Sequence, residues 1–134
     1  MHKLSLLIFR RMWTFRLIAV SALLLLAACG GGATSDPADV VLRFMDAKAK
    51  AHADTIRSLI CSEMESAWEQ QAASFGSVEA RLEGASCSRG GESDVVACAG
   101  SIVAVYGTET TSFPLTSYRV VQEDGEWKWC GEAP

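Results

Sequence analysis

The sequence predicts an α+β domain in which N-terminal helices pack on one face of a four-stranded antiparallel sheet. Three observations support this prediction. Apolar residues recur at helical spacing up to Phe75, and they alternate with polar residues from Ser77 onward. Clusters of turn-forming residues then divide the second half into segments of strand length. Helices followed by consecutive strands typically gather on one face of an antiparallel sheet, which is the α+β arrangement.

Three helices are expected in the first half of the domain, each with recognisable ends. Asp36-Pro37 is typical of an N-cap followed by proline at the first helical position. Asp54 is the expected cap of a second, short helix. Ser62 and Glu65 have the spacing of a capping box for a third helix, which we expect Gly76 to end. The residues at helical spacing in the first helix are Val40, Val41, Phe44, Met45 and Lys48.

Four strands are expected after the helices. Alternation of apolar and charged residues predicts the first over Val78–Glu83, and a run of β-branched and small residues predicts the second over Val95–Tyr106. The third is expected over Thr110–Gln122. The dipeptide Asp124-Gly125 is a strong signal for a hairpin turn into a final strand, Glu126–Cys130. The sheet is therefore expected to be a meander of neighbouring antiparallel strands.

Residues 1–28 have the features of an export signal peptide. Basic residues come first, and the apolar run from Leu17 to Ala28 is too short to span a bilayer. The tetrad that ends this segment, Leu26-Ala27-Ala28-Cys29, resembles the lipobox of bacterial lipoproteins. The resemblance implies that the chain is cut before Cys29 and that Cys29 is lipidated, for example with palmitate. The alternative is an ordinary secretory signal that leaves Cys29 as a free thiol.

The lipobox resemblance also predicts the organisation and location of the mature protein. Residues 29–35 are glycine-rich and would tether a single domain, residues 36–134, to a membrane on the extracytoplasmic side. Gly30 stands where many inner-membrane lipoproteins of Gram-negative bacteria have an Asp. This favours the outer membrane in an organism with two membranes, and otherwise the outer leaflet of the cytoplasmic membrane. Met12 is an alternative start to Met1.

Removal of the signal peptide leaves an acidic chain. The whole chain has 12 Lys and Arg against 16 Asp and Glu. Four of the basic residues and none of the acidic residues precede Cys29, so the mature chain has 8 basic residues against 16 acidic ones and a formal charge of −8. Such a surface gains nothing from counterion release at nucleic acid, which is therefore not an expected partner.

Four further cysteines predict two disulfides. Cys61, Cys87, Cys98 and Cys130 form an even set in a chain that leaves the reducing cytoplasm. They allow three pairings. We favour Cys87 with Cys98, across a hairpin, and Cys61 with Cys130, from a helix to the last strand. A metal site is the competing explanation, but no Cys-x-x-Cys pair occurs and His52 is distant from all four cysteines in the sequence. No metal or other cofactor is expected.

The domain also resembles a known superfamily. A capped first helix, a short second helix opening with an Asp, and a meander ending in Tyr118–Trp129 resemble the nuclear-transport-factor-two-like proteins, over roughly residues 36–131. More narrowly, they resemble small bacterial lipoproteins that carry this cystatin-like domain behind a lipobox. The resemblance implies a curved sheet wrapped around a long helix, a cystatin-like cone, with a cavity between them. Some members are isomerases, dehydratases or polyketide cyclases, and others bind or assemble without chemistry.

The sequence favours a non-catalytic function within this superfamily. Catalytic members place a carboxylate or a histidine inside the cavity. His52 beside Asp54 has the pattern of a solvated helix end, and Glu79, Arg81 and Glu83 alternate as a solvated strand face does. We therefore expect an envelope interaction protein rather than an isomerase or dehydratase. A small-ligand or peptide-binding module is the alternative. The cavity of such a module would be lined by Phe44, Met64, Trp68, Leu82, Val103 and Leu115.

Strand register predicts a surface for the interaction function. If the first two strands pair so that Cys87 lies opposite Cys98, Leu82 lies opposite Val103 on the face that the helices cover. The other face would carry an uncovered apolar cluster, large for a small monomer, that suits a homodimer or an envelope partner. A one-residue slip in register would exchange the two faces. The residues of this predicted partner face are Ile102, Tyr106, Tyr118, Trp127 and Trp129.

Overall fold

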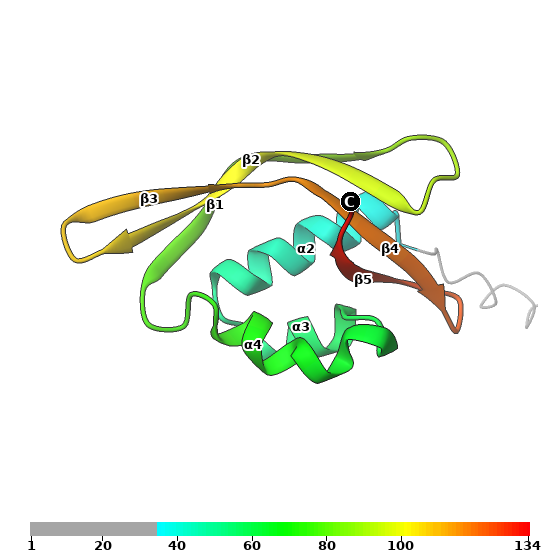
Figure 1. Ribbon diagram of the computed structural model, residues 1–134, viewed down its shortest axis with the longest axis horizontal. Helices are drawn as coiled ribbons and strands as arrows, with labels where there is room; N and C mark the ends of the chain where they lie inside the picture. The colour runs from blue at the N-terminus through cyan, green and yellow to red at the C-terminus, as the bar shows by residue number, and fades with distance from the viewer. Residues whose placement is uncertain (1–34) are drawn as a thin grey trace, which may run out of the picture. The chain divides into compact units, whose positions relative to one another are not determined.

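The computed structural model describes residues 35–134 of the chain. Within this range all the helices come first and all the strands follow them (Figure 1). Over these residues the predicted α+β class is confirmed, with three α-helices, one 3-10 helix and an open five-stranded sheet. The predicted signal peptide, Cys29 and the tether up to residue 34 lie outside the described residues. The elements are α2 (Pro37–Ala49), α3 (Ala53–Leu59), η1 (Ser62–Ala67), α4 (Trp68–Ala73), β1 (Glu79–Arg89), β2 (Val95–Tyr106), β3 (Glu109–Pro114), β4 (Ser117–Glu123) and β5 (Glu126–Glu132).

Helix α2 begins as the sequence predicts and forms the centre of the domain. The side chain of Asp36 accepts a hydrogen bond from the backbone N–H of Ala38 at 2.8 Å, and Pro37 occupies the first turn. Figure 1 shows α2 between the sheet and the layer formed by α3 and α4. Because it is covered from both sides, its apolar residues Val41 and Phe44 are fully buried.

The next two helices begin differently from the prediction. Asp54 does not cap α3, whose N-cap is His52 without a side-chain hydrogen bond. The predicted capping box of Ser62 does not form. Ser62 already lies inside η1, and its N–H donates to the Glu123 carboxylate at 2.9 Å. The chain enters this turn extended because the N–H of Cys61 is bonded to the Trp129 carbonyl of β5 at 2.9 Å. Helix α4 ends at Ala73, before Gly76.

Strand β2 has the predicted limits and organises the sheet, because it pairs with three other strands. Strand β1 runs along one side of it, and β3 and β4 follow one another along the other side. The predicted third strand is therefore two strands, and the sheet has five strands instead of four. The interruption follows Pro114, which lacks an N–H to donate, and Leu115 turns inward to a buried position.

A β-bulge shifts the register between β1 and β2. Cys87 pairs with Cys98 as predicted, but Gly84 and Ala85 lie together opposite Gly100. Beyond this point Leu82 pairs with Ile102, and not with Val103 as predicted. Since side chains alternate between the faces of a strand, one extra residue in β1 places Leu82 on the same face as Cys87. As a result, the apolar residues of β1 point toward the helices both before and after the bulge.

The predicted partner face is the interior of the protein. Ile102, Tyr118 and Trp129 share one face of the sheet, as predicted, but the helices cover this face, and each of the three is at most 4% exposed. The predicted uncovered cluster is therefore wrong. The ring of Trp129 stacks on that of Phe44 from α2, with centroids 4.0 Å apart. The same face also carries Trp127, which is half-buried with the Arg89 guanidinium over its ring, whereas Tyr106 is 43% exposed.

Both predicted disulfides are present. Cys87 and Cys98 join β1 to β2, and Cys61 and Cys130 join the segment before η1 to β5, over a sequence separation of 69 residues. Residues 35–134 thus enclose their own hydrophobic core and both cross-links, which is what a domain needs to fold by itself. Within this range no three His, Cys, Asp or Glu side chains are arranged to hold a metal ion. None of the helices described there has the length and apolar character to cross a membrane.

We expect Gly100→Ala to destabilise the domain more than Gly84→Ala. A Cβ on Gly100, at φ +95°, would lie 2.5 Å from the carbonyl oxygen of Gly84. Gly84 also has a positive φ, +58°, but a Cβ there meets nothing within 4 Å. The left-handed backbone alone costs an alanine about 1–2 kcal/mol, and the clash at Gly100 adds about 1–3 kcal/mol. Urea unfolding of both variants measures the difference. If both variants lose the same free energy of unfolding, the bulge must widen to accept the new Cβ without strain.

Candidate functional site

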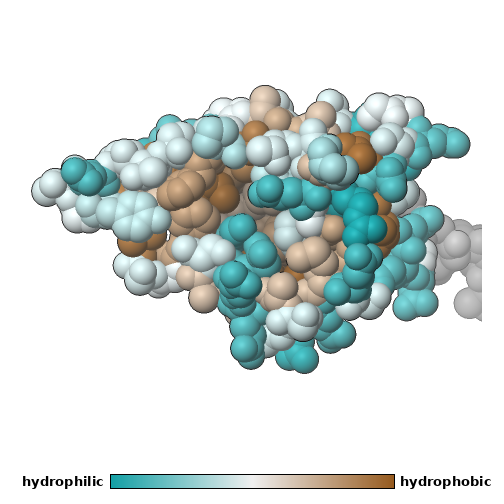
Figure 2. Space-filling model, viewed as in Figure 1, coloured by the Kyte–Doolittle hydropathy of each residue, from teal (hydrophilic) through white to brown (hydrophobic). Residues whose placement is uncertain are grey.

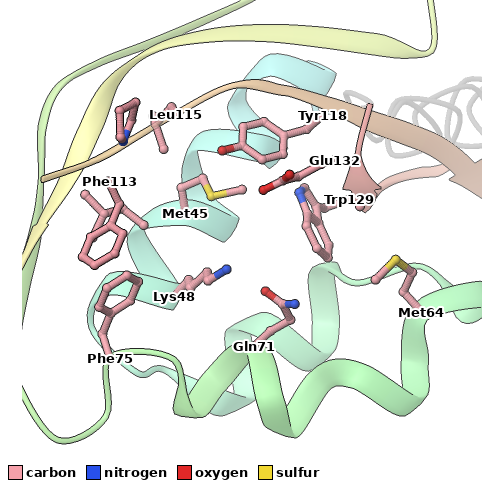
Figure 3. Close-up of a pocket in the computed structure, with 13 residues that line it drawn as sticks. Met45, Lys48, Met64, Gln71, Phe75, Phe113, Leu115, Tyr118, Trp129 and Glu132 are labelled. Atoms are coloured by element: carbon pink, nitrogen blue, oxygen red, sulfur yellow. The ribbon is translucent and has the colours of Figure 1, made fainter. Parts of the chain in front are cut away.

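A pocket of about 460 Å³ lies between α2, α4 and the inner face of the sheet (Figure 3). Its volume is within the usual range for sites that hold small organic molecules. Figure 2 shows hydrophobic and hydrophilic residues intermixed on this side of the molecule, where the pocket opens. The apolar part of the wall comprises Met45, Met64, Phe75, Ile102, Phe113, Pro114 and Leu115, and the polar side chains are Lys48, Gln71, Tyr118, Trp129 and Glu132.

The secondary structure explains why these polar residues meet. Lys48 follows Met45 by three residues on α2, so both side chains lie on the same side of the helix. Strand β5 contains a second bulge, because Tyr118 of β4 pairs with Glu132 whereas Val120 pairs with Trp129. This extra residue in β5 allows Trp129 and Glu132, three positions apart, to line the same pocket.

Two buried polar atoms of the pocket have no hydrogen-bond partner among the described residues. Trp129 is 3% exposed, and its indole N–H donates to none of them. The side-chain oxygen of Gln71 is likewise buried and unpaired. A buried polar group left in this state costs about 1–3 kcal/mol. Both residues line the pocket, and Figure 3 shows the Gln71 amide extending into it.

Lys48 brings a positive charge into the same space. Its side chain is half-buried, and the loss of hydration lowers the pKa of its ammonium below the ordinary value of 10.5, while attraction to the Glu132 carboxylate partly opposes this shift. Lys48 and Glu132 line the same pocket, and no salt bridge joins these two described residues. Figure 3 shows the end of Lys48 directed toward Trp129 and Gln71.

Tyr118 adds a further donor. Its hydroxyl oxygen accepts a hydrogen bond from the backbone N–H of Thr116 at 3.3 Å, which leaves the O–H hydrogen available. The ring is 4% exposed and the hydroxyl points across the pocket in Figure 3. The pocket therefore presents an ammonium, an indole N–H and a phenol O–H from three different elements.

The sequence predicted part of this site. Of the six residues expected to line a cavity, Met64 and Leu115 line the pocket. Phe44 is buried against Trp129, and Val103 lies on the strand face opposite to that of Ile102. Trp68 is half-buried beneath the Arg57 guanidinium, 5.2 Å from its ring centroid, and Leu82 lines a separate open hollow with Arg43 and His52.

The prediction missed the polar residues of the pocket, Lys48, Gln71, Trp129 and Glu132. One signal was present in the sequence. Lys48 occurs at the spacing of the apolar stripe of α2, so the pattern itself places a charged group on the face that the core covers. The sequence carries no such signal for Gln71, Trp129 and Glu132. These residues come together in the pocket only because α4 packs against the sheet and β5 contains a bulge.

The charged residues that were considered for catalysis lie elsewhere. His52 is exposed at the start of α3. Glu79, Arg81 and Glu83 are exposed on β1, where Arg81 and Glu83 form an ion pair at 2.6 Å. These positions agree with the expectation that both groups are solvated.

Comparison with protein-family models, with curated proteins and with solved structures finds no match for this chain. Its function is therefore inferred from the residues of the pocket and from the N-terminal sequence.

We expect Lys48→Met to stabilise the ligand-free domain. Because burial lowers the pKa of folded Lys48 below 10.5, the folded state binds this proton less tightly than the unfolded chain does. The free energy of unfolding then rises as the pH rises from the lowered pKa toward 10.5, and at neutral pH the charge is a cost. Methionine keeps the apolar stem and removes the charge. The gain should be below about 1 kcal/mol, because solvent still reaches the ammonium.

Lys50→Met is the matched control for this measurement. Lys50 is exposed near the same end of α2 and forms an ion pair with Asp46 at 2.8 Å. Its loss should lower the free energy of unfolding by about 0.3–0.5 kcal/mol. Thermal unfolding at pH 7 compares the two variants. A lower Tm for Lys48→Met than for the unsubstituted protein would contradict the assignment of Lys48 as a destabilising group.

Proposed function

We propose that this protein is a lipid-anchored, extracytoplasmic binding module whose pocket holds a small organic ligand. The observation that carries the proposal is the buried, unpaired indole N–H of Trp129, a residue that lines a pocket of about 460 Å³ together with the half-buried Lys48. A phenylalanine could stack on Phe44 without leaving a polar atom unpaired. A tryptophan at this position costs stability, and a ligand that accepts its hydrogen bond removes that cost.

Binding accounts for the pocket better than catalysis does. The isomerases and dehydratases that the superfamily resemblance implies need a carboxylate or histidine inside the cavity. Here the carboxylate of the pocket belongs to Glu132, which is an exposed residue. The position of the pocket between a central helix and the sheet supports the cystatin-like cone that the resemblance implies, and such cones serve as binding modules as well as enzymes.

The proposed location rests on the lipobox resemblance at Cys29 and on the two disulfides. Disulfides persist in oxidising compartments outside the cytoplasm, so their presence supports export of the domain. Lipidated Cys29 would hold the domain to the outer membrane of a two-membrane cell, or otherwise to the outer leaflet of the cytoplasmic membrane. Residues 30–35 then give the domain freedom to collect a ligand close to the membrane surface.

The lipid anchor is tested by labelling. When the full chain is expressed in a bacterium with labelled palmitate, we expect the label in the mature protein. Cys29→Ser should abolish both the label and the cleavage before residue 29. Label that survives this substitution would refute the lipoprotein assignment and leave an ordinary secreted domain.

The pocket is tested with a neutral apolar dye, N-phenyl-1-naphthylamine, and a secreted, unlipidated chain that begins at Gly30. We expect saturable binding with enhanced dye fluorescence. Gln71→Trp places an indole in the pocket and should weaken binding at least about tenfold, which corresponds to 1.4 kcal/mol. Gln70→Trp is the matched control, because Gln70 is the exposed neighbour on α4. Dye binding that Gln71→Trp leaves unchanged, or no saturable binding, would refute the proposed site.

A further inference from the structure

We infer that the ligand is a monocarboxylate with an apolar body, and that Lys48, Trp129 and Tyr118 hold its carboxylate. This inference rests on the proposed function, because it names the ligand class of the same pocket. The three residues come from α2, β5 and β4, and all of them line the pocket (Figure 3).

The donors of the pocket match a carboxylate in number and charge. Lys48 offers up to three N–H groups, and Trp129 and Tyr118 offer one each. A carboxylate has two oxygens with about four lone pairs, which is enough to accept a hydrogen bond from each of the three residues. A neutral carbonyl could accept from Trp129 but would add no negative charge near the half-buried ammonium beyond that of Glu132. An ionised acceptor also makes stronger hydrogen bonds than a neutral one.

Gln71 completes the surroundings of the head group. Its unpaired oxygen marks an amide that no described residue holds in place. A half-turn about the last torsion of the side chain would present its two N–H donors in place of the oxygen. The amide of Gln71 can therefore turn its N–H groups toward the anion. A side chain held by other hydrogen bonds could not do this.

Glu132 limits the charge of the ligand to one. Glu132 lines the same pocket, and its carboxylate attracts Lys48. A dianion such as a phosphate monoester would bring two negative charges against one lysine and would also be repelled by Glu132. Repulsion of an unwanted ligand is a common source of specificity, and here it favours a carboxylate over a phosphate.

The apolar wall indicates what the rest of the ligand is. Met45, Ile102 and Leu115 cover one part of it, and Phe75 and Phe113 form another part with their rings 5.4 Å apart in an edge-to-face arrangement. An alkyl or aromatic body buried here would strengthen binding roughly fourfold for each methylene group. The inferred class therefore includes medium-chain fatty acids and arylalkanoic acids.

The test compares four compounds with the same eight-carbon chain: octanoate, 1-octanol, octylamine and octyl phosphate. Each is titrated below its micelle concentration at pH 7 into the secreted chain that begins at Gly30. We expect octanoate to bind at least about tenfold more tightly than each of the other three, which corresponds to 1.4 kcal/mol. The ¹H–¹⁵N signal of the Trp129 indole, assigned with Trp129→Phe, should move downfield with octanoate as its N–H gains an acceptor.

Substitutions of Lys48 and Glu132 test whether their charges cause the preference for octanoate, and Lys50→Met is the control. Lys48→Met should bring the affinities for octanoate and 1-octanol within about threefold of each other, whereas Lys50→Met should keep the tenfold preference. Glu132→Gln should strengthen octyl phosphate binding by about tenfold. These ratios do not depend on a small loss of stability, because each compares ligands on one variant.

The possible outcomes separate the two proposals. If 1-octanol binds as tightly as octanoate, or octylamine binds more tightly, the carboxylate inference is wrong while the binding function stands. If Lys48→Met keeps the preference for octanoate, the anion is held elsewhere and the inference also fails. If none of the four compounds binds and the neutral dye does not bind either, the proposed function fails together with the inference.

Discussion

The contact of Trp129 with α2 and with Cys61 holds the domain together. The indole stacks on Phe44 with an interplanar angle of 12°, which joins the last strand to the central helix. The carbonyl of Trp129 accepts the N–H of Cys61, and the next residue, Cys130, forms a disulfide with the same cysteine. Two consecutive residues of β5, Trp129 and Cys130, thus attach this strand to both helical layers through an aromatic stack, a hydrogen bond and a disulfide. This attachment fixes the position of Cys61, and the chain continues from there into the 3-10 helix and α4, which borders the pocket.

This arrangement also explains why the pocket is polar at its base. The stack with Phe44 fixes the orientation of an indole that lines the pocket and whose N–H is buried and unpaired. Lys48 reaches the same space from one turn beyond Phe44 on α2, because residues four apart lie on one side of a helix. One aromatic contact therefore supports the core and positions two of the groups that we assign to ligand binding. The unpaired N–H and the partly dehydrated ammonium are stability costs that a bound anion would offset.

The disulfides allow a small domain to tolerate these costs. About a hundred residues bury a modest core, and the net stability of such domains is only about 5–15 kcal/mol. On the loop-entropy model, the cross-link between Cys61 and Cys130 contributes about 4–5 kcal/mol, since it closes a long loop, and the one between Cys87 and Cys98 about 3 kcal/mol. These contributions are large enough to offset a few unpaired polar groups. The two disulfides are thus also a condition for the pocket.

The sequence by itself determined the local features. Asp36-Pro37 begins α2, Val95–Tyr106 is β2, and Cys87 pairs with Cys98, because caps, strand patterns and hairpin cross-links depend on residues near one another in the chain. The predicted pairing of Cys61 with Cys130 joins the two cysteines of the four that then remain. Only the tertiary structure decided which face of the sheet is inside. The bulge at Gly84–Ala85 changes the register by one residue, and the helices then cover the face that carries Ile102 and Trp129. A glycine signals that a bulge is possible, but whether the chain uses it depends on packing across the whole core. The pocket follows from the same decision, so its polar residues could not be assembled from the sequence.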